Sequence, residues 1–283
     1  MIGQRIGKGK TAEVFEWLQE EAGSTERVIK LFFPSMEHMR DGEWEISQWI
    51  EGQGLPVPRT YGREEVSGRS GIIYERINGP TLTEAVASRL WNPGAAGSLL
   101  ASLHELVHRV TAAAEESASS QASTALSLPR QKEMLERYIR HTPLLEAAWR
   151  QRVLERLASL PAGDRLCHGD LHSDNVIISL RGPIILDWMT SVSGHPACDA
   201  ARTWMVLQDA SLPPGIPAEL VPWIEQFRED MAAAYKEAYT RGTGVTEEEI
   251  RDWLPVVAAA RLVENVDQEE QSRLLERVRA GLA

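Results

Sequence analysis

Three oxygen-bearing side chains are spaced closely enough in the sequence to act together. Asp170 and Asn175 lie in the run His168-Gly169-Asp170-Leu171-His172-Ser173-Asp174-Asn175, and Asp187 ends the apolar run that starts at Pro183. Phosphoryl transfer from a nucleotide needs a carboxylate that orients the attacking hydroxyl and oxygen ligands that hold Mg²⁺ on the phosphates. Asp170 fits the first role, and Asn175 and Asp187 fit the second. The stretch therefore suggests kinase chemistry as a working hypothesis.

Other interpretations of the same stretch exist. His168 and His172 are four residues apart around Asp170, which is a spacing used by metal sites. Gly169 disfavours a helix there, however, and no further Cys or His cluster completes a ligand set. Each of the acidic and amide residues could also cap a turn, and that interpretation is preferred for Asp174.

The elements that must position these residues begin with a β-rich segment. Alternation at residues 2–6 and 12–17, and the run 28–33, predict three strands, and residues 36–51 have helical spacing. Lys30 lies inside the apolar run, where a lysine needs an anionic partner. Glu43 on the following helix is the expected partner, with Glu45 second, and the alternative is a lysine on an edge strand that points to water.

A glycine pair lies between the first two predicted strands. Gly7 and Gly9 would let the backbone approach a phosphate closely. The segment is neither a Walker A loop nor a dinucleotide fingerprint, because a strand rather than a helix follows it. Taken alone, the pair is equally typical of a hairpin turn that uses glycine for positive φ.

The chain changes character after two further predicted strands, near 59–66 and 71–77. The sequence Thr81-Leu82-Thr83-Glu84 is a helix-start signal, and helical patterns dominate the remainder. The predicted fold is therefore α+β, with a small antiparallel β lobe at 1–77 and a larger, mainly helical lobe at 78–283. Residues 111–128 are rich in Ala, Ser, Glu and Gln and receive no function.

The net charge, the apolar runs and the cysteines of the chain limit the kinds of ligand and cellular setting that are expected. The chain has 283 residues and a net charge of −11, which argues against nucleic acid as a ligand. No apolar run approaches transmembrane length. The two cysteines, Cys167 and Cys198, are expected to be free thiols in a reducing, cytoplasmic setting.

The motifs together resemble the aminoglycoside phosphotransferase and choline kinase-like family, whose members share the protein kinase fold. The resemblance rests on the run 168–175 and on Ile185-Leu186-Asp187-Trp188, and extends upstream to Ile6-Gly7-Lys8-Gly9 and Lys30. It implies ATP and Mg²⁺ as cofactors, Lys30 on the phosphates with Glu43 as its partner, and adenine against the backbone of Glu75 and Ile77.

The resemblance also implies roles in the catalytic loop. Asp170 would be the catalytic carboxylate, and His172 would contact the γ-phosphate or merely pack. Asn175 and Asp187 would be the metal ligands, and Asp199 would brace the loop. The segment from Asp187 to Asp199 is too short for an activation segment, so a small-molecule hydroxyl, and not a protein, is the expected substrate.

The acceptor stays open at this point. An aminoglycoside-type antibiotic is the named hypothesis, and choline, homoserine, a sugar or another metabolite is the alternative. Acidic residues of the last third (Glu225, Glu229, Asp230, Glu264, Asp267) could meet a polyamine or simply form solvated helix faces. A nucleotide-binding protein without transferase activity and a metallohydrolase built on His168, Asp170 and His172 are the rival functions. The choice of ATP over GTP, the oligomeric state and the role of Arg261 do not follow from the sequence.

Overall fold

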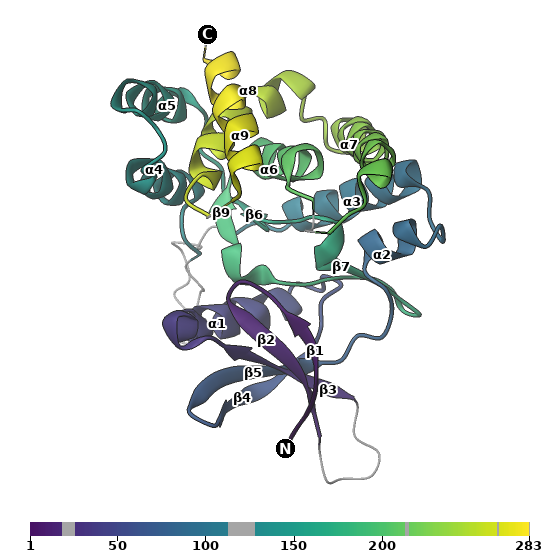
Figure 1. Cartoon of the computed structure of the whole chain (residues 1–283). Helices are drawn as coiled ribbons and strands as arrows, with labels where there is room; N and C mark the ends of the chain where they lie inside the picture. Colours follow the sequence, from purple (N-terminus) through teal and green to yellow (C-terminus); the bar gives the residue numbers. More distant parts are fainter. Residues whose placement is uncertain (19–25, 113–127, 213–214, 265, 283) are drawn as a thin grey trace. The chain divides into compact units, whose positions relative to one another are not determined.

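The computed structural model describes residues 1–18, 26–112, 128–212, 215–264 and 266–282. The chain forms two compact units (Figure 1). The first contains Met1–Glu84 and Asp174–Met189, and the second contains Ala85–Ser173 and Thr190–Ala283. The lobe boundary after residue 77 stays a prediction, and residues 113–127 of the Ala/Ser-rich segment lie outside the described residues.

The first unit is built on a five-stranded antiparallel sheet with the strand order β1-β2-β3-β5-β4. The strands are β1 (Ile2–Lys8), β2 (Ala12–Trp17), β3 (Arg27–Phe32), β4 (Thr60–Val66) and β5 (Arg69–Glu75). The expected strands are thus present, although β5 ends at Glu75 and leaves Ile77 beyond it. The expected helix at 36–51 is divided into a 3-10 segment, Pro34–Met39, and α1, Arg40–Glu51.

Side-chain alternation on the sheet makes two apolar faces. Ala12, Phe32 and Ile72 pack with residues of the 3-10 segment and α1, and Ile29, Leu31 and Ile73 pack on the other face. Because successive residues of a strand point to opposite faces, Lys30 shares the face of Phe32, on the α1 side. The core therefore fixes the direction in which this lysine points.

A two-stranded hairpin also belongs to the first unit. It consists of β7 (Val176–Ser179) and β8 (Gly182–Ile185), which are antiparallel. Ile185 donates its N–H to the carbonyl of Pro56 at 2.7 Å, and Thr81 forms a β-bridge with Ile177. These backbone bonds tie the hairpin to the remainder of the unit.

The second unit is mainly helical, as the sequence indicates. Its helices are α3 (Pro93–His108), α4 (Gln131–His141), α5 (Ala147–Ser159), α6 (Pro196–Asp209), α7 (Val221–Thr243), α8 (Glu247–Arg261) and α9 (Gln268–Gly281), and the short strands β6 (Arg165–Cys167) and β9 (Val192–Gly194) pair within it. The helix α2 (Leu82–Ala87) starts at the expected capping box, in which Thr81 and Glu84 bond reciprocally. The last helix begins after Asp267, which caps it by accepting the N–H of Glu270.

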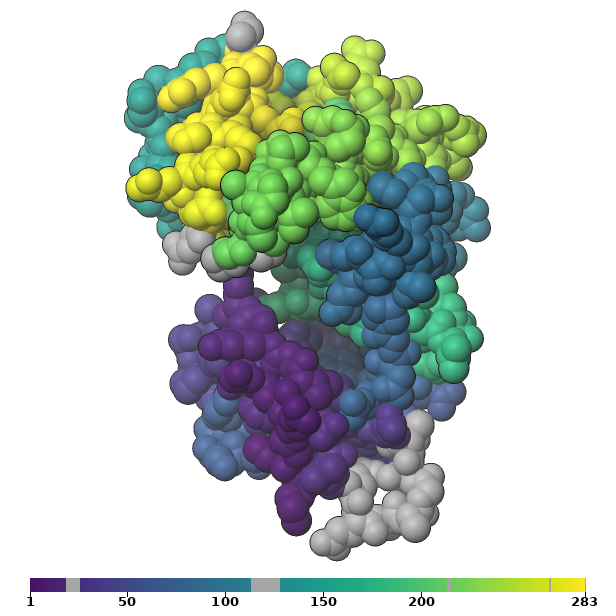
Figure 2. Space-filling view, turned by 45° about the vertical axis from the view of Figure 1, so that its right-hand side comes forward, coloured from purple at the N-terminus to yellow at the C-terminus, as the bar shows by residue number. Residues whose placement is uncertain are grey.

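The helices α3 and α7 pack closely in this unit. A Cβ at Gly97 would lie 2.3 Å from the carbonyl oxygen of Met231, so only glycine allows this approach. In Figure 2 the C-terminal half of the unit, in green and yellow, forms one continuous surface. No helix of the described residues is long and apolar enough to span a membrane.

Candidate active site

Lys30 is the centre of an ion-pair group in the first unit. Its Nζ lies 2.8 Å and 3.0 Å from the two carboxylate oxygens of Glu43 and 2.9 Å from Oδ1 of Asp187. The expected pairing with Glu43 is confirmed, and Glu45 is not needed as a partner. Burial alone would lower the pKa of Lys30, but the two carboxylates outweigh it, so the pKa is raised and the lysine stays charged.

Tyr74 provides a further contact to Glu43 that the sequence did not suggest. Its hydroxyl lies 3.1 Å from Oε1 of Glu43 and 3.1 Å from the hydroxyl of Ser47. Glu43 is almost fully buried, so these bonds satisfy a carboxylate that has little water around it. Tyr74 therefore helps to hold Glu43 against Lys30.

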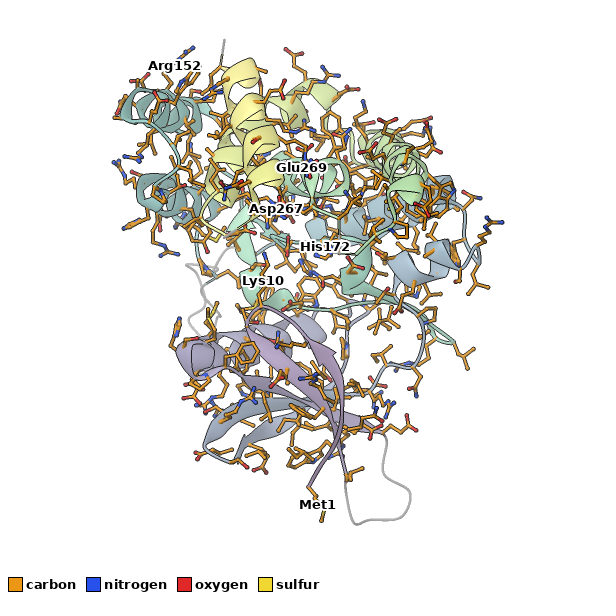
Figure 3. The ribbon with its side chains drawn as sticks, viewed as in Figure 1. Met1, Lys10, Arg152, His172, Asp267 and Glu269 are labelled. Atoms are coloured by element: carbon orange, nitrogen blue, oxygen red, sulfur yellow. The ribbon has the colours of Figure 1, made fainter. Side chains whose placement is uncertain are left out.

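The glycine pair lies in the hairpin of β1 and β2, whose turn carries Lys10 (Figure 3). Gly7 is paired with Val14, and the N–H of Gly9 donates to the carbonyl of Ala12 at 2.9 Å. Neither glycine is among the residues with positive φ, so the hairpin-turn interpretation does not explain them. A Cβ at either position would meet only ordinary contacts of 3.6 Å or more, so the hairpin itself does not require glycine.

Asn175 and Asp187 flank the same end of the β7–β8 hairpin. Val176 pairs with Ile185, and Leu186 donates its N–H to the carbonyl of Asn175 at 2.8 Å. This register places Asn175 directly before β7 and Asp187 two residues after β8, at the same end of the hairpin. Asp187 has φ of 60°, an uncommon left-handed conformation for a residue other than glycine, and its side chain is 42% exposed.

The backbone expected to meet adenine follows β5. Glu75 uses its N–H in a bond to the carbonyl of Arg59 at 2.9 Å, and its carboxylate pairs with Arg181. Ile77 lies two residues further on.

Asp170 belongs to the second unit, in a loop that Asp199 braces. The carboxylate of Asp199 accepts the N–H groups of His168 at 2.6 Å and Gly169 at 2.9 Å. Gly169 has φ of 82°, and a Cβ there would lie 2.4 Å from the carbonyl oxygen of Thr190. The bracing expected for Asp199 is thus present, and the loop conformation requires glycine before Asp170.

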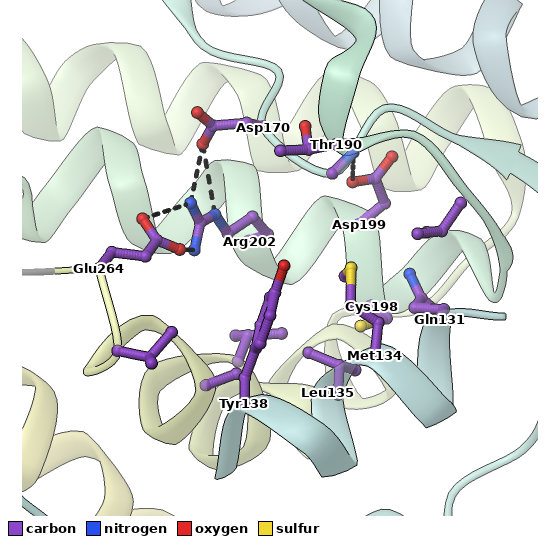
Figure 4. Close-up of a pocket in the computed structure, with 15 residues that line it drawn as sticks. Gln131, Met134, Leu135, Tyr138, Asp170, Thr190, Cys198, Asp199, Arg202 and Glu264 are labelled. Atoms are coloured by element: carbon purple, nitrogen blue, oxygen red, sulfur yellow. Dashed lines mark hydrogen bonds and ion pairs between the residues drawn. The ribbon is translucent and has the colours of Figure 1, made fainter. Parts of the chain in front are cut away.

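Arg202 is the neighbour of Asp170 that sequence reasoning missed. Its guanidinium donates to Oδ1 of Asp170 at 2.9 Å and to Glu264 at 2.6 Å (Figure 4). Burial would raise the pKa of Asp170, but Arg202 and the nearby His172 outweigh it and hold this pKa well below its usual range. Asp170 is therefore ionised at neutral pH. Arg202 lies three residues after Asp199 on α6, one helical turn away, which is the only sequence signal that could have found it.

The same ion chain explains Arg261. This buried arginine pairs with Glu270, and also with Glu264 at 3.0 Å. Alternating charges thus run from Asp170 through Arg202, Glu264 and Arg261 to Glu270. Glu264, considered above as a residue for a polyamine, is instead engaged by two arginines.

The two histidines of the catalytic loop differ in burial. His172 has its Nε2 3.6 Å from Oδ2 of Asp170 and is partly exposed. His168 is fully buried, and its Nδ1 accepts the N–H of Asp170 at 3.3 Å. Among the described residues, the set close enough to share an ion is His104, His108 and Asp199, so His168 and His172 do not form the alternative metal site.

That buried set is satisfied by hydrogen bonds alone. Oδ2 of Asp199 lies 2.9 Å from Nε2 of His104 and 3.2 Å from Nε2 of His108. Each Nδ1 lies 2.7 Å from a hydroxyl of α7, of Tyr235 or Tyr239. A carboxylate only accepts, so each Nε2 donates its hydrogen to Asp199, while each Nδ1 pairs with a tyrosine hydroxyl.

The pKa of His108 indicates that this histidine is neutral at pH 7. Burial and the neighbouring His104 lower the pKa of His108 to about 4. Burial would raise the pKa of Asp199, but the two histidines outweigh it and the pKa lies well below its usual value. The buried histidine pair therefore supports the carboxylate that braces the loop of Asp170.

Comparison with known proteins agrees with the motifs. A sequence model of the phosphotransferase enzyme family (APH) matches residues 3–253. The chain belongs to this family. The phosphotransferase has no significant match among curated protein sequences.

Three solved structures illustrate the similarity in fold. Amicoumacin kinase hAmiN, solved with AMP-PNP, Ca²⁺ and Ami, has a TM-score of 0.64 at 14% identity, over 99% of this chain and 87% of that chain. Choline kinase from Cryptosporidium parvum has a TM-score of 0.61 at 10% identity, over 99% of this chain and 88% of that chain. An aminoglycoside-3'-phosphotransferase of type VIII has a TM-score of 0.55 at 20% identity, over 93% of this chain and 92% of that chain.

These likenesses establish the fold. The expected protein kinase-like architecture is confirmed, and family membership together with this fold supports a small-molecule phosphotransferase.

Proposed function

We propose that this protein is an ATP- and Mg²⁺-dependent kinase that transfers the γ-phosphoryl group to a hydroxyl of a small molecule. The observation that carries the proposal is the position of Lys30, whose Nζ is held between Glu43 and Asp187. A partly buried lysine with two carboxylates is costly to maintain for stability alone. Such a group is suited to binding phosphate oxygens in a fixed place.

The nucleotide is assigned to the first unit. Lys30 contacts the phosphates, Glu43 orients it, and the backbone at Gly7 and Gly9 lies along the phosphates. The hairpin has room for a Cβ at both positions, so its own packing does not require glycine. A close approach of the phosphates to the backbone would explain the two glycines, which supports this assignment. The backbone of Glu75 and Ile77 is the proposed adenine contact.

Asn175 and Asp187 are the residues that would hold Mg²⁺. Their fit rests on donor chemistry, since an amide oxygen and a carboxylate stand at one end of a rigid hairpin. Magnesium bound there would neutralise charge on the phosphates. The exposure of the Asp187 side chain leaves it accessible to the ion.

Asp170 is the proposed catalytic residue, and its role is positional. Its pKa lies well below the usual range, so it is a weak base and orients the acceptor hydroxyl more than it removes a proton. A loose transition state for phosphoryl transfer needs little base strength. His172, whose Nε2 lies 3.6 Å from Oδ2 of Asp170, is the proposed contact to the transferred group.

The acceptor is a small molecule in this proposal. Aminoglycosides, choline, homoserine and sugars are the candidates that the sequence leaves open. No peptide substrate is expected, because only eleven residues separate Asp187 from Asp199. The cytoplasm is the proposed location, in keeping with two cysteines that are free and buried.

Thermal shift and turnover test the proposal together. Mg-ATP should raise the melting temperature, and Lys30→Met should reduce this shift strongly. Lys236→Met is the matched control, because it removes a partly exposed lysine that pairs with Glu247 in the second unit. A coupled assay of ADP release over a panel of hydroxyl compounds then separates a kinase from a nucleotide-binding protein. Mg-ATP binding without turnover of any compound would favour the latter, and no thermal shift would contradict both.

A further inference from the structure

A cavity of about 250 Å³ adjoins Asp170 within the second unit (Figure 4). It is lined by α4, α6 and α8, by Gly169 and Thr190, and by Val192 of β9. The ring of Tyr138 extends from α4 with its hydroxyl toward Arg202. The cavity thus borders the carboxylate to which we assign the acceptor hydroxyl.

The walls of this cavity are largely apolar. The apolar residues that line it include Met134, Leu135, Val192, Val257, Ala260 and Val263. An ammonium group placed against such walls loses water without gaining a partner, which is unfavourable by several kcal/mol. Apolar carbon is the natural complement of these walls.

The carboxylates of the cavity are already paired. Arg202 binds both Asp170 and Glu264. Asp199 accepts two loop N–H groups and faces two histidines. A ligand with several ammonium groups would have to displace Arg202 from Asp170 and Glu264, and would leave this guanidinium without a partner.

We propose that this cavity binds the apolar body of the acceptor, and that the acceptor is an alcohol with at most one positive charge rather than a polycation. The proposal rests on the function proposed above. A dry cavity of about 150 Å³ accommodates benzene, so this one suits a single substituted ring. Tyr138 can stack on that ring or hydrogen-bond a neutral polar substituent.

The transfer step follows from this placement. The acceptor oxygen forms a bond to the γ-phosphorus of a nucleoside triphosphate as the bond to the bridging oxygen breaks. The nucleoside diphosphate leaves with the electron pair of that bond. Asp170 holds the hydroxyl through a hydrogen bond, and the hydroxyl proton is released to water as the new bond forms.

Matched acceptors test the charge requirement. Single-ring alcohols without amines or with one amine should be phosphorylated, and kcat/KM should change less than about twofold between about 0.05 and about 0.5 M KCl. Turnover restricted to compounds with several amines, and falling steeply with salt, would overturn the inference while leaving the proposed kinase intact.

Binding tests the cavity without turnover. Saturation-transfer NMR with 2-phenylethanol, in the absence of nucleotide, should detect binding to the full chain. Ala260→Leu, which fills the cavity, should weaken binding by about tenfold or more, and Ala233→Leu, at an exposed position of α7, should not. Unweakened binding in Ala260→Leu, or no binding to the wild type, would contradict the inference. Melting curves check that Ala260→Leu is folded, and Tyr138→Ala supplies a second variant that leaves the volume open and should also weaken binding.

Discussion

His108→Gln separates the titration of the buried histidine pair from its hydrogen bonds. A glutamine amide can donate to Asp199 and accept from Tyr239, as the neutral imidazole does. It cannot take up a proton in the physiological range. The substitution therefore keeps the network and removes its dependence on pH.

The magnitude follows from the lowered pKa of His108. The ordinary value is 6.5 and the folded value is about 4. Between these two values the unfolded chain binds a proton that the folded chain does not, so the free energy of unfolding falls as the pH falls. At about 1.4 kcal/mol per pKa unit, protonation of His108 lowers the free energy of unfolding by about 3 kcal/mol between pH 7 and pH 4. Asp199 contributes below this window, because its pKa lies well below its usual 3.8.

Urea unfolding at pH 7, 6, 5 and 4 measures the effect. Over this range the free energy of unfolding of the wild type should fall by about 3 kcal/mol more than that of His108→Gln. At pH 7 the variant should be less stable than the wild type by about 1 kcal/mol, because its packing is imperfect. His141→Gln, at an exposed position of α4, is the matched control and should follow the wild type. Parallel curves for wild type and His108→Gln would refute the assignment of a neutral, buried His108.

Three further substitutions test the supports of the site. Tyr74→Phe removes the hydroxyl bonded to Glu43, and should weaken ATP binding by about tenfold, as titration calorimetry can measure; unaltered affinity would count against this support. Arg261→Met leaves Glu270 without its buried partner, and should lower the free energy of unfolding by about 3 kcal/mol in urea, whereas a change below about 1 kcal/mol would contradict the ion chain. Gly169→Ala forces a Cβ to within 2.4 Å of a backbone carbonyl oxygen, so turnover should fall at least about a hundredfold, and wild-type kinetics would show that the loop tolerates positive φ there without glycine.

Much of the first unit could be predicted from the sequence, because its signals are local. Alternation in β1 to β3 and a lysine within an apolar run are visible in short windows, and Glu43 lies on the next helix. Tyr74 could not be predicted, because its hydroxyl meets Glu43 only after β5 pairs beside β3. Its sequence neighbourhood is that of any buried strand.

The second unit was harder to predict, because its decisive contacts are long-range. Arg202 meets Asp170 across 32 residues, and His104 meets Tyr235 across 131. The packing of α3 on α7 that makes the latter contact depends on Gly97, which carries no such signal in the sequence. The acidic residues near the C-terminus looked like solvated faces or polyamine ligands, but Glu264 pairs with arginines that lie on two different helices.

The central claim is that Asp170 positions an acceptor hydroxyl for phosphoryl transfer. Its most direct test is the mass-spectrometric yield of phosphorylated acceptor with Asp170→Asn, next to Asp174→Asn as an exposed control four residues away. We predict that Asp170→Asn loses turnover by about a thousandfold or more while its affinity for Mg-ATP stays within about threefold, and that Asp174→Asn keeps both. Phosphorylated product at the wild-type rate with Asp170→Asn would contradict the account.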